Sequence, residues 1–219
     1  MEPPEPLTVR VESGRLQDLW QAVVRACDAD QHVAVDLCGA TFSGRTHGLK
    51  LSVARGTKTM YDRKMVLAPR SGLTLRNGAI ALDKGVCLVV ASGLVKMEAL
   101  SISGPGMESR KRASACLMRV SGPDSNLEMT CCEVDCCSDE AVRAMLVEGG
   151  ATLVMADCSI FARGAALGAQ VLGGCLRATR CVLSSRTEAL AVSTAAAART
   201  EGTGLGAGAG VGDLPTPPP

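Results

Sequence analysis

Leu73-Thr74-Leu75-Arg76-Asn77-Gly78-Ala79-Ile80 decides the fold, because its pattern returns along the chain. The pattern is an apolar residue, one spacer, an apolar residue, two spacers, a small or apolar residue, one spacer and a final apolar residue. Its copies occupy residues 35–42, 73–80, 95–102, 127–134, 153–160 and 176–183, of which the first is the faintest. They recur at intervals of about 20–40 residues, which is the range of stacked-repeat architectures.

Each copy holds two short alternating runs, such as Leu73-Thr74-Leu75 and Gly78-Ala79-Ile80. Alternation by two predicts β-strands, and the extra spacer at Arg76-Asn77 predicts a corner between them. A third apolar run precedes most copies, and turn-prone pairs such as Ser71-Gly72 and Gly149-Gly150 follow these runs. Three short strands per turn predict an all-β fold, a parallel β-helix of about six coils with like residues stacked inside.

The template also predicts which residues stack on one another in the interior. Three columns are expected, one for each of the last three template positions. Their members are Leu75, Met97, Met129 and Met155; Cys132, Cys158 and Cys181; and Ile80, Ile102, Val134, Ile160 and Leu183.

The repeat resembles the right-handed parallel β-helix of the pectin-lyase-like superfamily over roughly residues 31–185. That fold hosts both sugar-active enzymes and non-catalytic binding modules, so the resemblance implies architecture more than function. Related β-helices serve as substrate receptors in F-box-type ubiquitin ligase adaptors and as spindle or cytoskeletal adaptors. No F-box is visible in the sequence. The paired Asp and Gly-His-Gly segment of polygalacturonases are absent, as are the calcium-binding Asp clusters and catalytic Arg of pectate lyases.

The segments outside the repeat have a different composition. Residues 1–6 predict a disordered lead-in, and residues 7–30 predict a strand and a helix that caps the open first coil. Ser13 is the expected N-cap of that helix, and Trp20 its plug. The β-helix is expected to span residues 31–193.

The last segment, residues 194–219, is rich in Ala, Gly and Pro and predicts a disordered tail.

Composition excludes several functional classes. The net charge of +1 argues against nucleic acid as the main partner, and aromatic residues, at 2%, are too few to stack on bases. No secretory signal peptide and no membrane-spanning run is visible. The sequence therefore predicts an intracellular protein, cytoplasmic or nuclear, with reduced thiols, no membrane association and no cofactor.

A group of cysteines at residues 131–137 suggests a metal site at first. The template instead places Cys132 and Cys136 inward and Cys131 and Cys137 outward, so the four thiols do not converge. Packing of small polarizable side chains is the favoured interpretation. A zinc site, or redox regulation of the outward thiols, remains open.

Two insertions carry basic residues. The first, residues 43–64, is either a solvated loop or a recognition loop for an acidic partner or a phosphate-bearing ligand. Its candidate binding residues are Arg45, Lys50, Arg55, Lys58, Arg63 and Lys64. The second, residues 103–114, ends in a basic run before Ser114. That run is a solvated loop, a nuclear-localisation patch or a context for modification of Ser114.

The outward template positions offer few groups for catalysis. Glu128 and Glu133 are the only acids there, and Lys96 is expected to pair with Glu128. We therefore expect no enzyme, but a scaffold that binds other proteins through the basic insertion and an outer sheet face. The alternative is a β-helix that binds carbohydrate or cleaves polysaccharide, which needs converging carboxylates.

Overall fold

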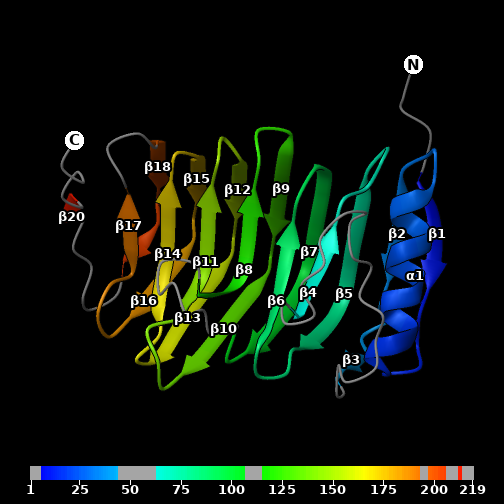
Figure 1. Cartoon of the computed structure of the whole chain (residues 1–219), viewed down its shortest axis with the longest axis horizontal. Coiled ribbons are helices and arrows are strands. Elements are labelled where there is room, and N and C mark those ends of the chain that lie inside the picture. Colours follow the sequence, from blue (N-terminus) through cyan, green and yellow to red (C-terminus); the bar gives the residue numbers. More distant parts are fainter. Residues whose placement is uncertain (1–5, 44–62, 107–114, 193–196, 206–211, 214–219) are drawn as a thin grey trace.

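The computed structural model describes residues 6–43, 63–106, 115–192, 197–205 and 212–213. These residues wind into a parallel β-solenoid of about six turns, with the N-terminal helix at one end (Figure 1). Every strand pair is parallel, as the repeat predicts. The handedness of the coil and its membership of a superfamily stay predictions.

A 13-stranded sheet bends along one line, so that it forms two faces of the solenoid. The strands before the bend form face A, which contains β1 (Leu7–Arg10), β2 (Val33–Asp36), the first halves of β5 (Leu73–Ala81) and β7 (Gly93–Gly104), β9 (Ser125–Thr130), β12 (Thr152–Ala156), β15 (Cys175–Thr179) and β18 (Ala197–Glu201). The strands after the bend form face B, which contains β3 (Thr41–Phe42), the second halves of β5 and β7, β10 (Glu133–Ser138), β13 (Ser159–Gly164), β16 (Val182–Ser185) and β19 (Gly204–Leu205).

A separate seven-stranded sheet forms face C. It contains β4 (Arg63–Leu67), β6 (Val86–Val90), β8 (Cys116–Ser121), β11 (Arg143–Glu148), β14 (Leu167–Leu172), β17 (Leu190–Val192) and β20 (Gly212–Asp213). The first five of these strands are the third apolar runs of the sequence. Each turn therefore passes once through each face.

The registers confirm the predicted inward columns. Met97 is paired with Met129, and Met129 with Met155. The final template positions are likewise in register, with Val134 between Ile102 and Ile160. All of these side chains are buried and belong to one continuous hydrophobic core. Stacked apolar columns thus hold the turns together, since each buried side chain removes apolar surface from water.

The first turn departs from the predicted alignment. Val33 and Val35 pair with Leu73 and Leu75, whereas the template had placed Val35 opposite Leu73. Two extra residues at the corner before β3 cause the shift. They place Leu37 against Gly78, where a Cβ would lie 2.5 Å from that of Leu37. Leu37 therefore fills the space beside Gly78. In later turns this space is occupied by the side chain of the residue that corresponds to Gly78.

The bend between faces A and B is made by residues with a left-handed backbone, one in each turn except the first, where both Cys38 and Gly39 have a positive φ. The corner residues other than glycine have φ between +50° and +59°: Cys38, Asn77, Ala99, Cys131, Asp157 and Arg180. Gly202, at φ +58°, makes the corresponding bend after β18. Successive corners are joined by hydrogen bonds, as where the backbone N–H of Cys131 donates to the carbonyl of Ala156 (3.0 Å). The extra spacer of the template is thus a single strained residue.

The helix α1 (Leu16–Asp28) packs over the N-terminal end of the solenoid, beside β1 and β2 (Figure 1). Its buried residues, which include Leu19, Trp20 and Val23, join the same core as the strands. Ser13 is not its N-cap, although the sequence predicts one there. The N-cap is Arg15, two residues after Ser13. Arg15 forms a parallel β-bridge with Ser43, and the helix begins at the next residue. Within the described residues, no helix has both the length and the apolar character needed to cross a membrane.

Part of the predicted disordered tail is ordered as strands. β18, β19 and β20 pair in parallel with β15, β16 and β17. Backbone pairing does not require large side chains, so the small residues of this segment can extend the sheets. The boundary at residue 193 is therefore wrong for these strands. Residues 206–211 and 214–219 lie outside the described residues, as do residues 1–5 of the predicted lead-in.

Candidate functional site

The outer surface of face A carries a straight row of side chains, one from each strand, which we call the outer row. Its members, in register from β7 to β18, are Lys96, Glu128, Val154, Arg177 and Arg199. Lys96 and Glu128 form an ion pair of 2.9 Å, which confirms the predicted cross-coil pair. Val154 is 36% exposed. The row thus changes from a neutralised pair, through an apolar residue, to two cations.

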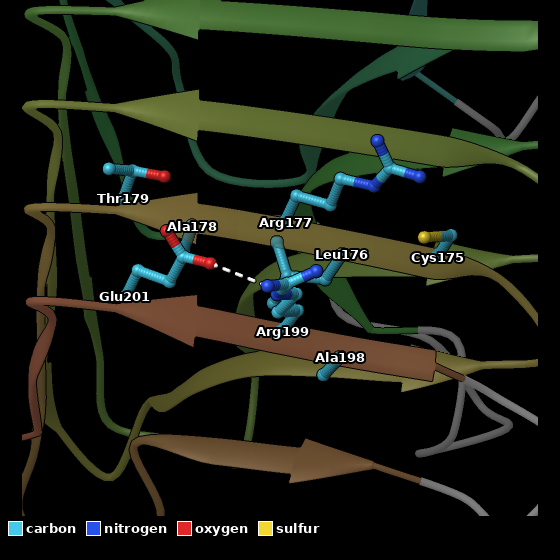
Figure 2. Close-up of a pocket in the computed structure, with 8 residues that line it drawn as sticks. All are labelled: Cys175, Leu176, Arg177, Ala178, Thr179, Ala198, Arg199 and Glu201. Atoms are coloured by element: carbon cyan, nitrogen blue, oxygen red, sulfur yellow. Dashed lines mark ion pairs between the residues drawn. The ribbon is translucent and has the colours of Figure 1, made fainter.

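A pocket of about 480 Å³ lies over β15 and β18 at the cationic end of the outer row (Figure 2). We call it the arginine pocket. It is lined by Cys175, Leu176, Arg177, Ala178, Thr179, Ala198, Arg199 and Glu201. Figure 2 shows the Arg177 side chain extending on the side of Cys175, and Glu201 facing Arg199. Guanidinium, hydroxyl and thiol groups therefore border one small space.

The two arginines of the pocket differ in their partners. Arg199 Nη2 lies 3.0 Å from Glu201 Oε1, but both side chains are mostly exposed. The Arg177 side chain has no hydrogen bond or ion pair with any residue in the described part of the chain. Because neighbouring parallel strands are about 4.8 Å apart, two like charges at paired positions repel each other. The pocket accordingly presents two cationic side chains, one of them without a partner in the described residues, and such a combination attracts oxyanions.

A second depression, about 430 Å³ in volume, lies at the corner between faces A and B. Cys131, Glu133 and Asp157 border it, together with the hydroxyls of Ser101 and Ser159. The Asp157 carboxylate is already occupied, because it accepts hydrogen bonds of 2.7 and 2.6 Å from Arg180. Glu133 is the other acid that lines this depression, and it has no such bond to an arginine of the described residues. The depression therefore lacks the pair of free carboxylates that a glycosidase needs.

The pKa shifts also show how the carboxyl groups are used. Hydrogen bonds lower the pKa of Asp18 through Ser13, of Asp36 through the backbone N–H of Cys38, and of Asp157 through Arg180. A general acid for glycoside cleavage needs a raised pKa, whereas the pKa of each of these three carboxyl groups is lowered. These carboxylates act as acceptors for neighbouring donors.

The cysteines occupy the predicted sides of the strands. In the cysteine-rich stretch, Cys132 and Cys136 are buried, while Cys131 and Cys137 are exposed. Burial raises the pKa of Cys136 to about 12, so its thiol stays protonated. Cys158 and Cys181 continue the column of Cys132. All eleven cysteines of the chain are free thiols.

Each thiol of the column bonds to the backbone of its own turn. The acceptors are the carbonyls of Thr130, Ala156 and Thr179, at 3.2–3.3 Å. These are local packing bonds inside the core. Within the described ranges, no three His, Cys, Asp or Glu side chains are grouped as metal ligands.

Two more thiols meet on face C. The sulfurs of Cys87 and Cys116 are 3.5 Å apart and fully buried. They belong to a small apolar cluster with Val89 and Leu146 on the outer side of this sheet. The local sequence pattern does not reveal this pair, because its two members lie in different turns.

The basic insertion is only partly covered by the structure. Arg45, Lys50, Arg55 and Lys58 lie outside the described residues, as does Ser114 of the second insertion. Arg63 begins β4, and Lys64 follows it in the same strand on face C. The binding site proposed at these six residues therefore stays a prediction.

The arginine pocket was not predicted, because Arg199 was assigned to the disordered tail. A signal for it is present in the sequence. Residues 198–205 follow the template spacing with Ala198, Thr200, Thr203 and Leu205, and the register pairs Ala198 with Leu176. Because most of these positions hold small or polar residues, this copy of the template is not recognisable from apolar spacing alone.

Comparison of the chain with protein-family models, with curated proteins and with solved structures finds no match.

Proposed function

We propose that the protein is a non-catalytic scaffold that binds a protein partner on the outer surface of face A. In this proposal it is a right-handed parallel β-helix of the pectin-lyase-like superfamily, and the basic insertion provides a second contact. The observation that carries the proposal is the arginine pocket, where Arg177 and Arg199 stand side by side at the end of a regular exposed row. A rigid solenoid holds such a row at fixed spacing, which favours recognition of an extended surface.

The remaining features of face A support binding over catalysis. Charged side chains along it are compensated in pairs, as in Lys96 with Glu128 and Arg76 with Asp36. The one acid of the arginine pocket, Glu201, is held by Arg199. Neither arrangement offers a proton donor together with a nucleophile.

A carbohydrate ligand is the second candidate, because paired arginines could also hold the carboxylates of a uronate polymer. The composition disfavours it. Sugar rings commonly stack on aromatic side chains, and the chain has one Trp, one Tyr and two Phe. Of these, Trp20 and Phe42 are buried in the core.

We also propose an intracellular location. The supporting observation is that eleven cysteines are unpaired, including the exposed Cys38, Cys131 and Cys137. Cys87 and Cys116 lie close together without being linked. Free thiols in this number are typical of reducing compartments.

Quantitative affinity capture tests the proposed function. The full chain and the charge-reversed variant Arg177→Glu/Arg199→Glu would be compared for the proteins that they retain from a cell extract. The matched control is Arg25→Glu/Arg186→Glu, which reverses two exposed charges away from the pocket. We expect the pocket variant alone to lose partners. Equal retention by all three proteins, or cleavage of polygalacturonate by the unmodified chain, contradicts the proposal.

A further inference from the structure

We propose that the arginine pocket binds an extended peptide segment in which one acidic side chain contacts Arg177 and Arg199 and a neighbouring apolar side chain covers Val154. The inference rests on the proposed function, since it specifies the partner chemistry of the same surface. It begins from the register, which places the two arginines on paired positions of β15 and β18.

The charges of the two arginines in the pocket are not fully compensated. Arg177 lacks a partner among the described residues, and Arg199 has only Glu201. The side chains of Arg199 and Glu201 are 80% and 59% exposed, so water screens their attraction and an incoming anion can replace it. A carboxylate that bridges both guanidinium groups forms several charge-assisted hydrogen bonds at once. Because the pocket is lined by two cations and one anion, the charge of one such carboxylate balances the net charge of its side chains.

Going toward the N-terminus, the outer row continues with Val154 and then Glu128. Val154 offers an exposed apolar side chain, and Glu128 beyond it is already paired with Lys96. A uniformly anionic polymer that crosses the row would therefore gain contacts at the arginines and find no uncompensated cation at Val154 or at the Lys96–Glu128 pair. An acidic segment followed by an apolar residue matches both positions, which favours a peptide over a polyuronate.

Glu201 occupies Arg199 when no ligand is bound, so it competes with the ligand. Its replacement by glutamine removes the competing charge and keeps the size of the side chain. Anion binding should then become stronger, which a purely structural role of Glu201 would not produce.

The experiment starts with selection of a displayed random-peptide library on the purified full chain. We expect enrichment of peptides that combine Asp or Glu with a neighbouring aliphatic residue. An enriched peptide would then be titrated against Arg177→Ala, Arg199→Ala, Glu201→Gln and the control Arg25→Ala. Loss of a charge-assisted contact predicts affinities weakened by about tenfold or more for the two arginine variants. Glu201→Gln should bind more tightly than the unmodified chain, and Arg25→Ala should bind equally.

Several outcomes overturn the inference. Failure to enrich any peptide, enrichment without acidic residues, or binding that is indifferent to Arg177→Ala would each do so. Binding of polygalacturonate that depends on Arg177, without peptide binding, assigns the pocket to a uronate instead. If affinity capture depends on Arg177 and Arg199 while no acidic peptide binds, the proposed function stands and this inference fails. The unfolding midpoint of each variant confirms that it is folded.

Discussion

Corner residues adopt a left-handed backbone conformation that is energetically favourable mainly for glycine. The bend between faces A and B places Ala99, Cys131 and Arg180 at φ values of +50° to +54°. For an L-residue this conformation costs about 1–2 kcal/mol. Such strain persists because the strands on both sides are fixed by their neighbours in the adjacent turns.

Ala99→Gly should stabilise the protein. The substitution removes the strain of the left-handed corner, which is partly offset by about 0.4–1 kcal/mol from the greater freedom of the unfolded chain. We expect a net gain of up to about 1 kcal/mol, measured as the free energy of unfolding in urea. The matched control is Ala156→Gly, whose residue ends a strand on the same face and has ordinary backbone geometry. The idea is wrong if both variants are destabilised equally.

Asp36 should make stability depend on pH. Its pKa is lowered by the backbone N–H of Cys38 and by Asn77 and Arg76, so the folded state binds its proton less tightly than the unfolded state does. The resulting stabilisation is complete above the unfolded pKa of about 3.9 and is lost as the pH falls through the lower folded pKa. Asp36→Asn should thus be less stable than the unmodified protein at pH 6, and the difference should shrink by pH 3. Urea unfolding at both pH values checks this, and a constant difference would refute it.

At the scale of single elements, the fit between neighbouring turns depends on which side chain fills each position. Gly78 stands in the column that Leu100 and Cys132 occupy later, because Leu37 of the preceding turn already fills that space. The irregular first turn and the glycine of the second therefore form one matched pair.

Gly78→Ala should destabilise the solenoid by about 1–3 kcal/mol, because the new Cβ would overlap with Leu37 and with the carbonyl of Ala40. In the double variant with Leu37→Gly, the added cost of Gly78→Ala should be smaller, since the Cβ of residue 37 that lies 2.5 Å from the new methyl group is then absent. A double-mutant cycle of unfolding free energies measures this coupling. Gly204→Ala is the control, because nothing lies within 4 Å of its added Cβ. Strict additivity of the two changes would contradict the explanation.

How much of the fold could be predicted depended on how strictly each turn kept the template. Met97, Met129 and Met155 were placed correctly because alternation by two is unambiguous in gapless copies. The first copy was misaligned because two extra corner residues precede β3. The last copy was missed because Ala198 and Thr200 lack the apolar character that marks a strand. The arginine pocket needs that last copy, so sequence pattern alone did not reveal it.

The helix end shows a second limit. Ser13 precedes an apolar helical pattern, which normally indicates an N-cap. Its hydroxyl instead accepts a hydrogen bond from the backbone N–H of Arg15 (3.3 Å). The bridge between Arg15 and Ser43 sets the start of the helix, and a contact between residues so far apart in sequence is not visible in a local pattern.

For the whole molecule, the continuous core makes the turns depend on one another. Ile160 is fully enclosed between Val134 and Leu183 in neighbouring turns. Ile160→Asp places an uncompensated charge in that column, so we expect no cooperatively folded protein. Val182→Asp is the matched control, because Val182 is 43% exposed on the outer side of the same sheet. Circular dichroism and gel filtration of both variants test this, and a cooperatively unfolding Ile160→Asp protein would show that the column has been misassigned.

The equivalent turns of the coil have a consequence for its length. The Gly149-Gly150 and Gly173-Gly174 corners lead into β12 and β15, which occupy the same place in successive turns. Excision of residues 152–174 would remove one complete turn and join two equivalent positions. The solenoid would be shorter by one turn, and both of its ends would be unchanged. Arg177 would then stand directly beside Glu128, since both flank Val154 in the register. The length of the solenoid and the chemistry of its surface are therefore coupled, because a chain shorter by one turn loses the apolar residue of the outer row and brings a carboxylate next to Arg177.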